Sequence, residues 1–387
     1  MPATPVNWHG TIPGGGAIVD NTLQVDVDNN YFYAWADYTA FGLGQTTRLL
    51  KVAMGSMTIV AQSALTSGNL LDNNPIVPVP SWTGTKLWGE LWDSGSSTVK
   101  TTSWDKTTLA IVDQWPAPTL PAGSGGLGIP ALNSDGTMAA WIVYPNTGDN
   151  AIVLMNLATG AYSVVEASTI GGPAPNQNFP YFLPCFDAAG NLWSYDSASN
   201  FWKITIISVM GTPIATSVTI INARTNDGAS FAQCDFNPTT NIMTAWSGKT
   251  SGNDVWVVPI NTLTSTVGTI YTLPNGAYAY EGTSSDMQGW ENKRYVAVIQ
   301  QEPFTSAANE VGVFDRQTGI TTYYDWMATW GIPVPTGLKI TGLTVNSTGT
   351  LINAVNDYQT NAPYTAYFWF MPLGSPAIAK TYAEIFN

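Results

Sequence analysis

The sequence predicts an all-β protein, and three observations lead to that prediction. Charged residues make up only 10% of the 387 residues, while glycine (36), proline (25), tryptophan (16) and tyrosine (17) are abundant. Segments rich in Thr, Val, Ile and aromatic residues are separated by Gly, Pro, Asn and Asp, which is typical of short strands joined by tight turns. No long stretch carries apolar residues at helical spacing.

A short turn motif recurs along the chain. It is clearest at Asn133-Ser-Asp-Gly136, Asp187-Ala-Ala-Gly190 and Asn346-Ser-Thr-Gly349, where Asn or Asp comes first and Gly fourth, as in a type I turn followed by a positive φ. A second turn motif, Asn156 to Gly160 and Asp315 to Gly319, follows at a similar distance in two repeats. The first large apolar residue after each turn of the first kind marks the repeat: Tyr31, Leu87, Met138, Leu192, Ile242, Tyr295 and Leu351.

Each repeat contains about four short strands, for example LGIPAL, TMAAWIVYP, NAIVLMNL and AYSVVEA in the third. Four strands repeated seven times predict a single seven-bladed β-propeller of four-stranded antiparallel blades. Seven repeats use the whole length, so we expect one domain over residues 1–387. The approximate blades are 16–70, 76–118, 127–170, 180–222, 230–274, 279–328 and 337–387.

Residues 131–167, ALNSDGTMAAWIVYPNTGDNAIVLMNLATGAYSVVEA, resemble the WD40-like repeat of the TolB-type propellers. Units of that family run Ser-Pro-Asp-Gly, two apolar strands and Asp-x-x-Thr-Gly, and residues 310–324 resemble the second half of such a unit. The third repeat departs from the pattern, because it has Asn-Ser-Asp-Gly without the proline. The resemblance implies the fold and a general bias toward protein–protein interaction, and it leaves the activity open.

The charge balance excludes one class of partner. A net charge of −13, with no cluster of Lys or Arg, would repel a polyanion, so we expect no nucleic acid. The N-terminus, MPATPVNWHG, shows no signal peptide. The apolar stretch 202–221 contains Lys203, Gly211 and Pro213 and is predicted to be two strands around a turn, so no membrane insertion is expected.

The sequence lacks the residues that several enzyme classes require for catalysis. The only histidine, His9, would have to serve any Ser-His-Asp triad, and no Gly-x-Ser-x-Gly elbow occurs. Zinc or copper sites built from His and Cys are likewise disfavoured, and Cys185 and Cys234 are expected to be buried thiols, with a single bridge as the alternative. We interpret the oxygen-rich segment 26–30, DVDNN, as a tight turn rather than a calcium site, and expect no cofactor.

Glycosidase chemistry is the enzyme class least excluded, since it needs only two carboxylates. Asp187, Asp235, Glu281 and Asp286 lie near the presumed inner strands, although Asp187 is already explained as the first residue of a turn. The sialidase Asp-box is absent, and an arginine triad would need three of the four arginines in the chain, which are Arg48, Arg224, Arg294 and Arg316.

Aromatic residues fall into two groups. We expect packing between blades for Trp141, Trp193, Trp246 and Trp256, which lie within strand patterns. The candidate residues for binding a ligand or partner lie in or beside Pro- or Gly-rich segments between blades, where exposed rings suit sugar stacking or protein anchoring: Trp115, Tyr278, Tyr280, Trp326 and Trp330.

These observations favour a non-enzymatic propeller that acts as a protein-docking or receptor-binding module. The loop-rich, Lys-poor composition without an export signal suits a component of a phage-like virion or another extracellular assembly, with a cytoplasmic setting as the alternative. The expected partners are other proteins of that assembly, or a surface receptor or glycan. Two alternatives remain: a carbohydrate-binding or carbohydrate-active propeller (a lectin or a two-carboxylate glycosidase), and an intracellular WD40-like interaction scaffold.

Overall fold

The computed structural model is built almost entirely of β-strands, as the composition predicts. The described residues contain no α-helix and one 3-10 turn, η2 (Ala167–Ile170). The structure describes residues 6–10, 17–18, 24–25, 31–37, 46–53, 58–64, 66–67, 79–80, 84–93, 98–122, 130–143, 148–174, 184–224, 229–237, 240–249, 255–273, 295–300, 310–315, 320–325, 338–345, 350–357, 365–372 and 379–381.

The described strands form seven antiparallel sheets, which we number by chain order. Sheet 1 contains β2 (Ala17–Ile18), β3 (Gln24–Val25), β4 (Tyr31–Asp37), β5 (Thr46–Ala53), β6 (Thr58–Gln62) and β7 (Thr66–Ser67). Sheet 2 contains β8 (Val79–Pro80), β9 (Lys86–Asp93), β10 (Thr98–Asp105) and β11 (Ile111–Pro116). Sheet 3 contains β12 (Ala131–Leu132), β13 (Met138–Val143), β14 (Ala151–Asn156) and β15 (Tyr162–Glu166).

The other four sheets follow the same antiparallel order. Sheet 4 contains β16 (Cys185–Phe186), β17 (Leu192–Tyr195), β18 (Asn200–Val209) and β19 (Thr212–Asn222). Sheet 5 contains β20 (Ala229–Asn237), β21 (Ile242–Lys249), β22 (Val255–Asn261), β23 (Thr266–Val267) and β24 (Tyr271–Leu273). Sheet 6 contains β25 (Tyr295–Gln300), β26 (Glu310–Asp315), β27 (Ile320–Asp325) and β31 (Ala379–Thr381). Sheet 7 contains β28 (Leu338–Val345), β29 (Thr350–Asp357), β30 (Thr365–Pro372) and β1 (Val6–Gly10).

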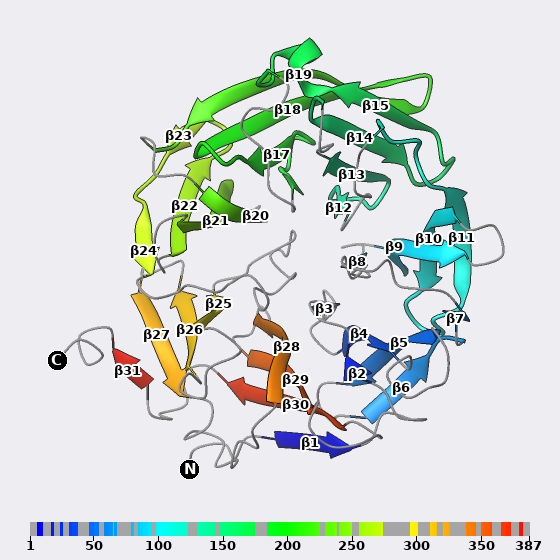
Figure 1. Ribbon diagram of the computed structural model, residues 1–387, viewed down its shortest axis with the longest axis vertical. Helices are drawn as coiled ribbons and strands as arrows, with labels where there is room; N and C mark the ends of the chain where they lie inside the picture. Colours follow the sequence, from blue (N-terminus) through cyan, green and yellow to red (C-terminus); the bar gives the residue numbers. More distant parts are fainter. Residues whose placement is uncertain are drawn as a thin grey trace.

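Figure 1 shows the sheets arranged around a ring. In sheet 3, β12 lies nearest the centre of the ring and β15 lies at the rim of the ring. Sheets 1 and 5 contain more than four strands, but their strands occupy only four positions across the sheet, because two short strands share one neighbour. β2 and β3 both pair with β4, β6 and β7 both pair with β5, and β23 and β24 both pair with β22. The N-terminal strand β1 pairs with β30 over five residues, so sheet 7 combines the first described strand with strands from near the other end of the chain.

The last predicted blade differs in one respect from the structure. Residues 379–381 fall in the span 337–387 expected for the seventh blade, but β31 pairs with β27 of sheet 6. The first predicted blade began at residue 16, and the structure places the preceding strand β1 in sheet 7 instead of sheet 1. Turn spacing could not reveal either strand, because each pairs with a strand distant in the sequence.

The recurring turn has the conformation that its residues predict. In sheet 3 the Asn133 side chain accepts hydrogen bonds from the backbone N–H groups of Thr137 and Met138, and Gly136 has a φ of +68°. In sheet 4 the Gly190 N–H donates to the Asp187 carbonyl at 3.1 Å, and Gly190 has a φ of +80°. The stretch 202–221 is also confirmed as two strands, β18 and β19, around a turn.

Neighbouring sheets pack face to face, and the alternation of side chains along one strand explains how. On β13, Ala139, Trp141 and Val143 contact sheet 2, whereas Ala140 and Ile142 contact sheet 4. Both faces of the strand are therefore buried, which accounts for a continuous apolar run in place of an alternating one. Trp141, Trp193 and Trp256 are buried between sheets as predicted, while the side chain of Trp246 lies outside the described residues.

The interface between sheets 4 and 5 contains both cysteines. Cys185 and Cys234 are buried, belong to the same apolar cluster and are both free thiols, which confirms the expectation of no bridge. Burial raises the pKa of the Cys234 thiol.

Candidate functional site

Trp115 is the one candidate binding residue that the structure describes, and it lies at the junction of sheets 2 and 3. It belongs to β11, is half-buried, and its indole N–H donates to the Leu157 carbonyl at 3.1 Å. A Cβ on Gly160 would lie 2.8 Å from the indole ring, so the tryptophan packs directly on the turn of the next sheet. Tyr278, Tyr280, Trp326 and Trp330 lie outside the described residues, so their binding role and that of Trp115 stay predictions.

The cross-strand register places a buried carboxyl in the same row as Trp115. Thr101 on β10 lies opposite Trp115 on one side and Glu90 of β9 on the other. Glu90 is 1% exposed and neither of its carboxyl oxygens has a hydrogen-bond partner; the Thr101 hydroxyl is also buried and unpartnered. Loss of hydration raises the pKa of Glu90 well above its ordinary value.

Asp113 also carries a carboxyl on this face of sheet 2, and this carboxyl already has an ion-pair partner and a hydrogen-bond partner. Lys86 donates to Asp113 in an ion pair, and the Ser103 hydroxyl donates to the same oxygen. Burial alone would raise the pKa of Asp113, but these two donors lower it below its usual value. The Cα atoms of Glu90 and Asp113 lie two strands and two residues apart, or roughly 12 Å along the sheet.

Two aspartates of sheet 4 accept hydrogen bonds from tryptophans, and only Asp187 is among the residues predicted from the sequence. Asp187 accepts the Trp193 indole N–H at 2.8 Å, and Asp196 accepts the Trp202 indole N–H at 2.8 Å. Burial raises the pKa of Asp196, although the donors from Trp202 and Asn200 oppose that shift. The signal was present in the sequence, since DAAGNLW and DSASNFW share the spacing D-x-x-x-N-x-W.

Asp187 is therefore confirmed as a turn residue with no free carboxylate oxygen. Of the other carboxylates considered for glycosidase chemistry, the side chain of Asp235 and all of Glu281 and Asp286 lie outside the described residues, as does the segment 26–30. Within the described part of the chain, no three His, Cys, Asp or Glu side chains gather as metal ligands.

A polar cluster lies between sheets 4 and 5. Tyr195 and Ser199 are fully buried, and neither hydroxyl makes a hydrogen bond of normal geometry. Burial raises the pKa of Tyr195 to about 12, an effect that the nearby Ser199 hydroxyl and Arg224 guanidinium oppose. The guanidinium carbon of Arg224 lies 3.1 Å from the centre of the Trp256 ring, which is a stacked cation–π contact. We call these four residues the Arg224 cluster.

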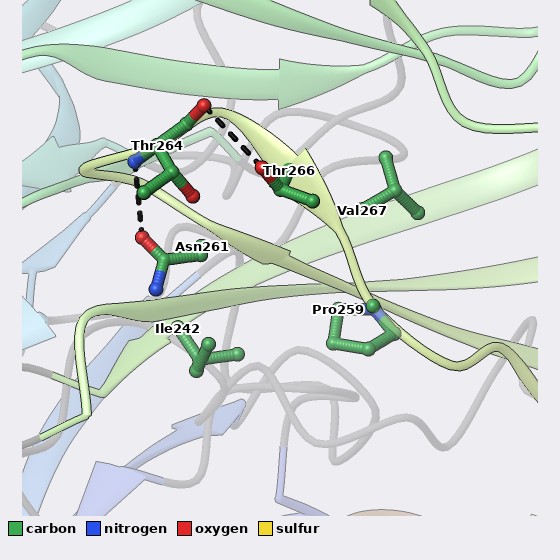
Figure 2. A pocket seen from close by; sticks show the side chains of 7 residues that line it. Ile242, Pro259, Asn261, Thr264, Thr266 and Val267 are labelled. Carbon is green, nitrogen blue, oxygen red and sulfur yellow. Dashed lines mark hydrogen bonds between the residues drawn. The ribbon is translucent and has the colours of Figure 1, made fainter.

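A pocket of about 340 Å³ opens at the turn between β22 and β23. Figure 2 shows its walls, in which Ile242, Pro259 and Val267 supply apolar side chains. The Thr264 backbone N–H donates to the Asn261 side-chain oxygen at 3.1 Å and fixes the turn. The pocket contains no titratable side chain, so it offers a surface for contact and no acid–base chemistry.

The hairpin of β18 and β19 carries an exposed apolar tip. Met210 is fully exposed, and Ile207 and Val209 are about half exposed. The hairpin is held on sheet 3, because the Asn156 side-chain amide donates to the Gly211 carbonyl at 2.8 Å. A fixed apolar tip of this kind is typical of a protein contact. We call Ile207, Val209 and Met210 the hairpin tip.

None of the described residues forms a helix that is long and apolar enough to cross a membrane. His9 belongs to β1, the outermost strand of sheet 7, where it lies opposite Tyr367 of β30.

Comparison with known proteins supports the fold and no particular activity. No family model matches the sequence, and no curated protein matches it. Among solved structures, an oligogalacturonate lyase in complex with manganese aligns over 96% of this chain and 98% of its own at 11% identity, with a TM-score of 0.57. An oligogalacturonate lyase from Vibrio parahaemolyticus aligns over 97% and 99% at 11% identity, with a TM-score of 0.58.

The Cps50 (Swd1) β-propeller domain of Myceliophteria thermophila aligns over 92% of this chain and 99% of its own at 8% identity, with a TM-score of 0.54. These similarities show that the chain has a β-propeller fold. They also confirm, at the level of fold, the resemblance to WD40-like and TolB-type propellers.

Proposed function

We propose that this chain is a closed propeller of seven blades that serves as a protein-docking or receptor-binding module without catalysis of its own. Seven sheets among the described strands, and the pairing of β1 with β30, support the ring of seven. Its setting is an extracellular or virion assembly, and its partners are other proteins of that assembly.

The hairpin tip is the observation that carries this proposal. Apolar side chains on a rigid hairpin cost little conformational entropy when they dock, which favours protein contact. Methionine adapts its shape to a partner surface, so Met210 at the end of the hairpin suits this use. The carboxylates of Asp187 and Asp196 accept hydrogen bonds from buried tryptophans and so have a structural role. The exposed residues at the rim of the propeller are therefore the better candidates for recognition.

The test is association of the purified chain with particles isolated from its source. Replacing Ile207 and Met210 with serine should weaken co-sedimentation by about tenfold or more, the size expected for central contact residues. Val60→Ser is the control, since Val60 is also exposed but lies on β6 of sheet 1. Equal co-sedimentation of all three chains, or recovery of a free enzyme that turns over a small substrate, contradicts the proposal.

A second candidate function is recognition of an acidic carbohydrate, and the Arg224 cluster favours it. The Arg224 guanidinium is half-buried and stacked on the Trp256 ring, and a guanidinium held in this way suits a sugar carboxylate. The two lyases named above act on an oligogalacturonate, an acidic sugar, and have the same overall fold.

This candidate is tested by titrating the protein with oligogalacturonate in a calorimeter and following the ultraviolet absorbance of unsaturated products, with and without manganese. Binding that Arg224→Gln abolishes favours the candidate. Arg48→Gln is the matched control, because Arg48 pairs with Gln62 in sheet 1. Product formation would identify an enzyme, and the absence of any heat change would reject the candidate.

A further inference from the structure

The C-terminal strand β31 is added to sheet 6 from the far end of the chain. It follows β28, β29 and β30 of sheet 7, yet it pairs with β27 through Thr322 with Thr381, Tyr323 with Lys380, and Tyr324 with Ala379. Figure 1 shows β31 at the outer side of β27, beside the C-terminus. Three residue pairs hold it, compared with five for β1 on β30.

Comparison with sheet 3 shows that β31 occupies an additional outer position. The segment Asp315 to Gly319 joins β26 to β27, as Asn156 to Gly160 joins β14 to β15. By this correspondence β27 matches β15, which is the outermost strand of sheet 3. The strand β31 therefore lies beyond the position at which sheet 3 ends.

The outer edge of β27 differs from the outer edges of sheets 1 and 5. Those edges are interrupted, between β6 and β7 and between β23 and β24, and interruption prevents an edge from pairing with another chain. β27 is an unbroken strand of six residues, ITTYYD, so its outer backbone groups form a continuous template for a further strand.

We propose that this edge is a strand-binding site that takes the C-terminal strand of a second copy of the chain, in a reciprocal exchange. Only six residues, Leu-Gly-Ser-Pro-Ala-Ile, join Pro372 to Ala379. Short connections of this kind favour exchange of an end segment between identical chains, and the two-fold dimer that results is closed.

Charge supports this occupant over an arbitrary peptide. The acceptor strands β26 and β27 carry Glu310, Asp315 and Asp325, while the donated strand carries Lys380 and no acidic residue. The chain as a whole has a net charge of −13, so a cation at the contact reduces the repulsion between two copies. A second copy supplies that cation in the strand that already fits this edge.

The first experiment measures binding to the vacated edge. A chain that ends at Pro372 lacks β31, and a labelled synthetic peptide of residues 375–387 should bind it saturably. A Lys380→Pro peptide should bind about tenfold more weakly or not at all, because proline is disfavoured inside a paired strand. If the shortened chain does not fold, the full chain with Lys380→Pro serves as the acceptor.

The second experiment tests exchange between full chains. Two differently tagged preparations, mixed at high concentration and warmed, should form heterodimers that co-purify, and the same pair with Lys380→Pro should stay monomeric. If the acceptor chain is folded and does not bind the labelled peptide, the proposed strand-binding site is wrong. Full chains that never co-purify, or Lys380→Pro chains that co-purify equally well, overturn the exchange.

Discussion

The buried carboxyl of Glu90 makes the stability of this propeller depend on pH in a predictable direction. In the native state Glu90 is buried and its pKa is raised by loss of hydration, whereas in the unfolded chain the pKa returns to about 4.3. Above that value the unfolded chain has released the proton while the native chain still holds it. The free energy of unfolding therefore falls as pH rises, until the native carboxyl also ionises.

The size of this effect follows from linkage. One proton held only by the native state changes the free energy of unfolding by about 1.4 kcal/mol per pH unit. Glu90→Gln keeps the shape of the side chain and cannot ionise, so the variant loses this slope. Relative to the native protein, Glu90→Gln should therefore gain about 1.4 kcal/mol for each pH unit between the two pKa values of Glu90.

The assay is urea unfolding followed by tryptophan fluorescence at half-unit pH steps from pH 4 upward, on both proteins. Glu166→Gln is the control for removal of one negative charge, because Glu166 lies exposed at the end of β15. The control should track the native protein, while Glu90→Gln diverges from it. Parallel pH profiles for Glu90→Gln and the native protein would refute the assignment of Glu90 as a buried, protonated carboxyl.

Three further predictions test the packing and the turns, each by thermal and urea unfolding. Gly160→Ala should destabilise by more than Gly190→Ala, because both positions have a positive φ but only the first would press a Cβ within 2.8 Å of Trp115; overpacking costs about 1–3 kcal/mol. Ser265→Gly should stabilise by about 1 kcal/mol, because Ser265 has a φ of +56° that glycine adopts without strain. Trp202→Phe should cost about 3 kcal/mol or more, since a buried carboxylate loses its indole donor.

The architecture could be predicted because the turns have a local physical cause. Asn133 and Asp187 each bond the backbone of the residues that follow, and a glycine then takes the positive φ. Such turns need only a few neighbouring residues, so they are visible in the sequence. The burial of Trp141 was predictable for the same reason, because it stands in a strand pattern between two turns.

Other turns of the same geometry contain no glycine, so a glycine pattern in the sequence does not mark them. The turn from Asp105 to Leu109 has the same backbone bond as the turn from Asn156 to Gly160, with the N–H of the fifth residue donating to the carbonyl of the first at 2.8 Å in both. Leu109 takes a φ of +57° without being glycine. Its side chain is 1% exposed in the core between sheets 1 and 2, so burial of leucine offsets the backbone strain.

The candidate site was harder to predict, because its residues meet through pairing across the sheet. Glu90 and Trp115 are well separated in the sequence and come into one row only through Thr101. No local pattern marks such a row, and a carboxyl in a strand gives no sign of whether a neighbouring sheet will cover it. Arg224 and Trp256 likewise meet only because sheets 4 and 5 lie side by side.

The sheets satisfy the same physical requirements with different residues. This explains why the repeat has a regular spacing although its residue types vary. In three described sheets the turn between the third and fourth strands needs an acceptor for two backbone N–H groups, which Asp105 supplies in sheet 2, Asn156 in sheet 3 and Asn261 in sheet 5. The fifth residue needs a positive φ, which glycine adopts without strain in sheet 3 and which Leu109 and Ser265 adopt with some strain in sheets 2 and 5. Because each requirement is satisfied within one sheet or between two neighbours, residues can change one sheet at a time while the ring persists.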